Sequence, residues 1–116
     1  MDMLTLVAAA MLSMAAMKGD PLDNARKAYN NCMIEVHNAA VGEKASPSAF
    51  IKTTESSCMT ERAAYHAIMV KAERSYGSNA KDAEQFANEE VQGLVDSIVS
   101  AFNENVESGA KLSAEK

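Results

Sequence analysis

The fold is decided by residues 32–58, which read CMIEVHNAAVGEKASPSAFIKTTESSC and begin and end on the only two cysteines of the chain. Cys32 lies ten residues before Gly42, and Cys58 lies twelve residues after Ser46. If both flanks are helices, a rise of about 1.5 Å per residue places the two sulfurs about 15 and 18 Å from the turn. A hairpin brings them to nearly the same height, so we predict one disulfide that joins two helices.

Helix start and stop signals surround this hairpin. Asp-Pro at 20–21 and Ser-Pro at 46–47 each place an N-cap residue before a proline in the first turn, and Ser-Asn at 78–79 offers a third N-cap. Gly42 and Gly77 stand where a left-handed residue commonly ends a helix. Because apolar residues repeat at helical spacing between these signals, we expect helices over 21–41, 47–76 and 79–107.

The order of these helices predicts an all-α protein. The short connections favour an up-down-up three-helix bundle over 20–107, with an inter-helix disulfide between the first two helices. The Ser- and Thr-rich run at 55–60 has modest helix propensity, which is compatible with a kink or a short break. Nothing in the sequence anchors residues 108–116, so we predict a flexible tail there.

The first residues differ in composition from the rest of the chain. Residues 3–17 carry no charge, and their length suits the apolar core of a signal peptide but falls short of the roughly 20 residues that span a bilayer. Ser13-Met14-Ala15 supplies a small-x-small cleavage pattern, although Asp2 replaces the usual basic residue. We therefore predict a signal-peptide-like segment over 1–15 and a periplasmic or secreted protein. The alternative is a cytosolic regulatory protein in which residues 1–17 form a real helix.

Charge and motif content exclude several function classes. The net charge is −5 and no Lys/Arg cluster is present, which argues against a nucleic-acid partner. Gly-rich phosphate loops and hydrolase motifs are absent, so we predict no cofactor. The two cysteines lie far apart in sequence, which favours a structural bridge over a redox centre. His37 and His66 lack metal-ligand spacing, so we expect two surface histidines and no metal site.

Glu61 is the candidate for a polar site. It follows Cys58 by three residues on the inward stripe of the second predicted helix, where a carboxylate needs a partner because an unpaired buried charge is costly. Tyr29, Tyr65 and Arg62 are the partners that the sequence offers. Three roles stay open for Glu61: a structural hydrogen bond, ligand recognition, or a catalytic acid, for which no second positioned carboxylate is evident.

The last predicted helix carries an acidic run. Asp82, Glu89 and Asp96 are spaced by seven residues and therefore share one outward face. This face is either a solvated surface or a docking surface for a cationic partner, in which case binding would depend steeply on salt.

Tyr29-x-x-Cys32, Phe50 and Cys58-x-x-Glu61, placed between a signal-like start and an acidic, Ala-rich last helix, resemble a group of small exported helical proteins of Gram-negative bacteria with no assigned function. The resemblance covers residues 22–105. It implies an envelope or periplasmic location and a disulfide between the two cysteines, and it implies no activity.

These observations favour a non-enzymatic exported module that acts by binding. Its partner would be another envelope protein, a peptide, or a small apolar molecule held between helices. The competing hypothesis is a small enzyme or an inhibitor-type effector that uses Glu61 in a pocket near the disulfide.

Overall fold

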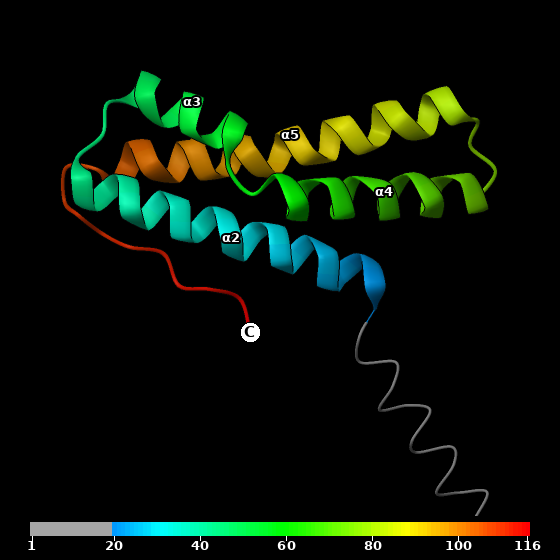
Figure 1. Ribbon diagram of the computed structural model, residues 1–116, viewed down its shortest axis with the longest axis horizontal. Coiled ribbons are helices and arrows are strands. Elements are labelled where there is room, and N and C mark those ends of the chain that lie inside the picture. The colour runs from blue at the N-terminus through cyan, green and yellow to red at the C-terminus, as the bar shows by residue number, and fades with distance from the viewer. Residues whose placement is uncertain (1–19) are drawn as a thin grey trace, which may run out of the picture.

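The structure is a computed structural model that describes residues 20–116, so the predicted segment over 1–15 lies outside the described residues. The described chain is all-helical, as predicted, and contains no strand (Figure 1). Its helices are α2 (Pro21–Glu43), α3 (Pro47–Ser56), α4 (Met59–Ser75) and α5 (Ala80–Asn105). Within 20–116, no helix is long and apolar enough to cross a membrane.

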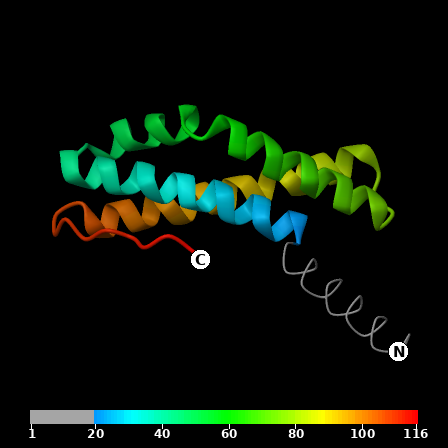
Figure 2. The ribbon, with the colours of Figure 1, turned by 60° about the horizontal axis from the view of Figure 1, so that its bottom comes forward.

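The helices lie lengthwise against one another. α2 runs in one direction, α3 and α4 return beside it one after the other, and α5 runs back along them (Figures 1 and 2). α5 packs against α2, α3 and α4, and α2 also packs against α3 and α4. All four helices contribute to the core, whose largest fully buried apolar side chains are Tyr29, Met33, Val41, Phe50, Val91 and Phe102.

Three N-caps form where the sequence predicts them. The side chains of Asp20, Ser46 and Asn79 accept hydrogen bonds from backbone N–H groups of the first helical turns, at 3.1, 3.2 and 2.8 Å. The end of the first helix is different from the prediction. α2 continues past Gly42 to Glu43, and Lys44 takes the left-handed conformation with φ 52°.

The predicted single helix over 47–76 is two helices, and the break falls inside the run that the sequence marks as weak. α3 ends at Ser56, and Cys58 has a left-handed backbone with φ 58° just before α4 begins. The hydroxyls of Thr53 and Thr54 bond to backbone carbonyls one turn earlier, at 3.0 and 2.6 Å, which shows how such residues compete for backbone groups. Cys58 is therefore a junction residue and does not lie in mid-helix.

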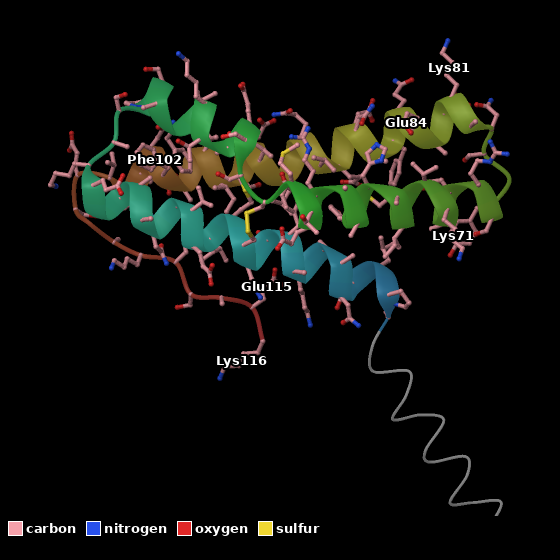
Figure 3. All side chains as sticks on the ribbon, in the orientation of Figure 1. Lys71, Lys81, Glu84, Phe102, Glu115 and Lys116 are labelled. Atoms are coloured by element: carbon pink, nitrogen blue, oxygen red, sulfur yellow. A yellow bond between two sulfur atoms is a disulfide. The ribbon has the colours of Figure 1, made fainter. Side chains whose placement is uncertain are left out.

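The Cys32–Cys58 disulfide is present, as predicted, with the two Cα atoms 6.0 Å apart. It joins the middle of α2 to the junction between α3 and α4, where Figure 3 shows the yellow sulfur–sulfur bond. The bond therefore holds the junction between α3 and α4 against the middle of α2.

Residues 108–116 do not lack an anchor, contrary to the prediction. After α5 the chain turns and runs back along α2 (Figure 1). Leu112 packs against the core, and Glu115 is held by side chains of α2. The prediction failed because these contacts join residues 74 to 89 positions apart, which a local pattern does not reveal.

Candidate functional site

The predicted polar site near the disulfide is only partly assembled. Glu61 lies in the first turn of α4, and one of its carboxylate oxygens and the two sulfurs all lie within 4.8 Å of one another. Across residues 20–116, the Glu61 carboxylate has no hydrogen bond or ion pair with Tyr29, Tyr65 or Arg62. Because both sulfurs are bonded to each other, they offer no thiolate to a metal ion or a substrate.

Tyr29 and Tyr65 lie side by side in the core, with ring centroids 6.3 Å apart. Tyr29 is fully buried, and its hydroxyl has no hydrogen-bond partner in the described part of the chain. Burial raises the pKa of both hydroxyls, so both phenols stay protonated at neutral pH. The two tyrosines therefore act as core aromatics in this structure.

Two small cavities border these residues. One, of about 190 Å³, lies between the α3–α4 junction and α5, and its lining includes Ile51, Arg62 and Asp96. The other, of about 250 Å³, lies at the start of α2, and its lining includes Arg26, Tyr65 and Phe86. Both are smaller than the roughly 300–1,000 Å³ that is typical of small-molecule sites. They suit a side chain better than a whole ligand.

The acidic residues Asp82, Glu89 and Asp96 are all exposed on α5. Each accepts a hydrogen bond from an amide of its own helix end or turn, at 3.2 Å from Asn79, 3.2 Å from Gln85 and 2.9 Å from Gln92. Solvent and these local partners satisfy the carboxylates, and the geometry by itself favours no partner for this face.

His37 is buried, and the prediction of a surface histidine is wrong for this residue. The ring lies between α2 and the end of α5, and its Nε2 accepts from the Asn105 amide at 3.3 Å. Its Nδ1 donates to Asn38 Oδ1 at 2.8 Å. The prediction failed because the end of α5 and the returning tail cover a face of α2 that the stripe pattern left to solvent. His66 is partly exposed, 2.9 Å from Asn88.

A site that sequence reasoning missed lies along α2 at the edge of this core. We call it the tail-binding face and define it by four side chains of α2 that hold residues 112–115: Arg26, Asn30, Asn31 and Asn38. Figure 3 shows Glu115 beside α2 at the centre of the molecule, with Lys116 beyond it. Lys27 adds a hydrogen bond to the carbonyl of Lys116 at 3.1 Å.

Two asparagines of this face each bind the backbone of one tail residue through a pair of hydrogen bonds. Asn38 donates to the carbonyl of Leu112 at 3.0 Å and accepts from its N–H at 2.9 Å. Asn31 does the same for Glu115, at 3.0 and 2.8 Å. Each side-chain amide thus makes the two hydrogen bonds that a neighbouring β-strand would make to the backbone of one residue. These four hydrogen bonds involve no side chain of the tail.

The spacing of these pairs explains their register. Seven helical residues from Asn31 to Asn38 rise about 10.5 Å, and three extended residues from Leu112 to Glu115 span about 10 Å. The tail runs antiparallel to α2, so one bound residue meets each asparagine. The length of an extended segment from Leu112 to Glu115 therefore matches the distance between Asn31 and Asn38, which lie two helical turns apart.

Buried His37 fixes the orientation of Asn38. Because Asn38 Oδ1 accepts from both His37 and the Leu112 N–H, its Nδ2 is left to donate to the Leu112 carbonyl. The chain of hydrogen bonds from Asn105 through His37 to Asn38 therefore pre-orders the amide from inside the core.

The carboxylate of Glu115 is bound by three N–H donors. Arg26 donates to its two oxygens at 2.9 and 2.8 Å, and Asn30 donates at 2.6 Å. The hydrogen bond from Arg26 is the main reason that the pKa of Glu115 lies below its usual range, and the same bond raises the pKa of Arg26. Arg26 also pairs with Asp23 at 3.2 Å. This is a bidentate carboxylate site, which an arginine fork provides and a lysine does not.

The signal for this face was present in the sequence. Asn30, Asn31 and Asn38 lie in the interior of a helix, where asparagine is a poor helix former. Their spacing of one, seven and eight residues places them on one side of the helix. Helix-interior asparagines that share a face and avoid the apolar stripe indicate a partner for their amides, although the partner itself is not apparent from the sequence.

The docking of the tail is expected to depend on pH. Because the pKa of Glu115 is lowered on docking, its contribution is complete above the ordinary glutamate pKa of about 4.3 and is lost as the pH falls through the lower value. We expect the hydrogen-exchange protection of the Leu112 and Glu115 amides to fall below about pH 4. Protection of the Val95 amide in α5 serves as the control. Constant tail protection between pH 7 and pH 3 would contradict this.

Comparisons of the chain with known protein families, with curated proteins and with solved structures found no match. The class that the fold defines is a small all-helical protein with one disulfide.

Proposed function

We propose that this chain is a non-enzymatic binding protein that holds an extended peptide segment along the tail-binding face of α2. The observation that carries the proposal is the pair of two-point amide contacts made by Asn31 and Asn38. Such contacts use the N–H and C=O that every residue except proline offers, so they bind a backbone of almost any sequence. This is the helix counterpart of strand addition to a sheet edge.

The compartment in this proposal is outside the cytoplasm, in the periplasm or beyond. A disulfide indicates an oxidising, exported environment, because such bonds are rare in reducing compartments. Residues 1–15 would act as the export signal. The partner would be an envelope protein with an extended segment or a free peptide.

We also propose that α3 and α4 act as a single interrupted limb of an up-down-up three-helix bundle. Both lie beside α2 and α5, and the disulfide holds their junction to the middle of α2.

The alternative of an enzyme or effector that uses Glu61 has less support. The sulfurs beside Glu61 are bonded and carry no nucleophilic thiolate. The nearby Tyr29 phenol has a raised pKa and is a poor proton acceptor. The cytosolic alternative depends on residues 1–17, which lie outside the described residues.

A peptide library tests the proposed function. The full chain with Leu112→Ala, whose own tail is weakened, is offered random heptapeptides, and we expect a subset to be retained. Adding Asn31→Ala and Asn38→Ala removes four hydrogen bonds and should lower retention at least about tenfold.

The matched control is Asn103→Ala, which removes an exposed asparagine from α5 and should leave retention unchanged. Thermal melting of each variant verifies that the chain is folded. If no peptide is enriched by the folded Leu112→Ala chain, the proposed function is wrong and the asparagines serve only to fix the tail.

A further inference from the structure

Three side chains of metal-binding types meet where α2 passes the junction between α3 and α4. Cys32 Sγ, Cys58 Sγ and one carboxylate oxygen of Glu61 all lie within 4.8 Å of one another. We propose that these three residues bind a Zn²⁺ ion when the disulfide is reduced, and that oxidation closes the bond and releases the metal. The proposal uses no residue of the tail-binding face, so it is independent of the proposed function.

The backbone already has the spacing that a shared metal ion needs. The Cα atoms of Cys32 and Cys58 are 6.0 Å apart. Two thiolates bound to one tetrahedral Zn²⁺ at about 2.3 Å have their sulfurs about 3.8 Å apart, and a carboxylate oxygen on the same ion lies about 3.5 Å from each sulfur. Rotation of the three side chains about their χ angles supplies shifts of this size. The helices can therefore stay in place while the covalent bond is exchanged for a metal ion.

The third ligand is placed by the start of α4. Cys58 is the N-cap of this helix and Glu61 lies three residues later, which are the two positions whose side chains face each other in a capping box. Glu61 is half-buried, and within residues 20–116 its carboxylate forms no hydrogen bond or ion pair. A carboxylate withdrawn from water costs free energy unless it is paired. A cation held by the two sulfurs would supply that partner.

The start of α4 also favours the anionic form of the Cys58 sulfur. The side chain of Cys58 makes no capping hydrogen bond to the first turn of the helix. The free N–H groups and the dipole at a helix N-terminus stabilise a thiolate, which is the form of cysteine that binds a metal. Cys32 and Cys58 are both half-buried, so a reductant and a metal ion can reach them from solvent.

The donor set selects the metal. Two thiolates and one carboxylate suit a borderline-soft ion such as Zn²⁺, whereas Ca²⁺ and Mg²⁺ need oxygen donors. Three protein ligands leave the fourth tetrahedral position to a water molecule. The sequence-based expectation of no metal site was drawn from the spacing of His37 and His66, and the proposed site uses neither histidine.

The change between the two states is a thiol–disulfide exchange. A dithiol reductant transfers two hydrogens to Cys32 and Cys58 and becomes a disulfide itself, which breaks the bond between the two sulfurs. Zn²⁺ then displaces the two thiol protons. In the reverse direction a disulfide takes two electrons from the thiolates and two protons from solvent, the Cys32–Cys58 bond re-forms, and Zn²⁺ is released.

Metal binding by the full chain, reduced with a phosphine and freed of metal, tests the proposal. We expect the reduced natural chain to take up one Zn²⁺ in competition with a chromogenic chelator, and one Cd²⁺ with a thiolate-to-metal charge-transfer band in the ultraviolet. The oxidised chain and the Cys32→Ala, Cys58→Ala double variant should bind neither ion. Glu61→Gln should weaken Zn²⁺ binding by the reduced chain at least about tenfold, since even groups that only orient a metal ligand are worth that much.

The matched control is Glu55→Gln. Glu55 lies three residues before Cys58 on the exposed surface of α3, so this change removes the same charge at the same sequence distance and should leave the affinity for Zn²⁺ unchanged. Equal affinities of the reduced Glu61→Gln and Glu55→Gln chains would overturn the proposal. A metal-bound form that is a dimer bridged between two chains would overturn it as well.

Thermal melting gives a second readout. Saturating Zn²⁺ should raise the melting temperature of the reduced natural chain by several degrees, because the ion restores the link between α2 and the junction, and should leave that of the oxidised chain unchanged. If reduction unfolds the chain, Zn²⁺ should restore its helical circular-dichroism signal. A reduced chain that takes up no Zn²⁺ and gains neither stability nor helical signal from it would show that the three side chains form no metal site.

Discussion

Replacing both cysteines, Cys32→Ala and Cys58→Ala, is expected to lower the melting temperature by at least about 10 °C. The bond closes a loop with a sequence separation of 26, for which the chain-entropy estimate is about 3.5 kcal/mol. A domain of about 100 residues shifts by about 4 °C or more for each kcal/mol. The covalent link therefore supplies a large share of the roughly 5–15 kcal/mol that is typical of a native domain.

Thermal melting monitored by circular dichroism, with and without a phosphine reductant, measures this effect. The reductant should lower the melting temperature of the natural chain to that of the double variant and leave the double variant unchanged. A natural chain whose melting curve is the same in both conditions would contradict a stabilising role for the bond.

The effect is expected to be large because of where the bond lies. Cys58 is a junction residue with a left-handed backbone, and α3 has only ten residues. A helix of that length is marginal by itself, so it depends on packing against α2 and α5. Releasing the junction from α2 lets α3 and α4 reorient separately, which weakens both packing surfaces together.

Much of the fold could be predicted because its signals are local. The capping residues Asp20, Ser46 and Asn79 act within one turn of their own helices, and the apolar stripes repeat within each helix. The disulfide followed from two sequence distances and the helical rise. The break at Cys58 was marked only as a weak run, since the final choice between a kink and a break depends on how α3 and α4 pack.

The rest could not be predicted because it depends on distant contacts. His37 is buried by the end of α5, and the tail is held by residues 74 to 89 positions earlier. The proximity of Glu61 to the disulfide followed from their three-residue spacing, but its lack of a protein partner among the described residues did not. The tail-binding face could not be completed from the sequence, because its helix-interior asparagines indicate a partner for their amides but do not identify the tail as that partner.

Phe102→Ala is expected to cost about 3–5 kcal/mol of the free energy of unfolding. Phe102 is fully buried and stacks on Phe50 with ring centroids 4.2 Å apart, and its ring is nearly perpendicular to that of His37, with the centroids 6.4 Å apart. Because the core around a removed side chain relaxes only partly, this change leaves a cavity beside Phe50, and the lost packing adds to the lost burial.

Chemical denaturation of Phe102→Ala measures that loss, and Phe86→Ala is the matched control. The two phenylalanines lie on the same helix, but Phe86 is 38% exposed and its loss should cost about 1 kcal/mol or less.

Phe102→Ala should also loosen the tail-binding face. With the ring gone, His37 loses its packing, Asn38 is no longer held in one orientation, and the Leu112 amide should lose hydrogen-exchange protection. Equal costs for the two substitutions would show that the α3–α5 stack is not the centre of the core, and unchanged protection at Leu112 would show that the tail-binding face is ordered independently of it.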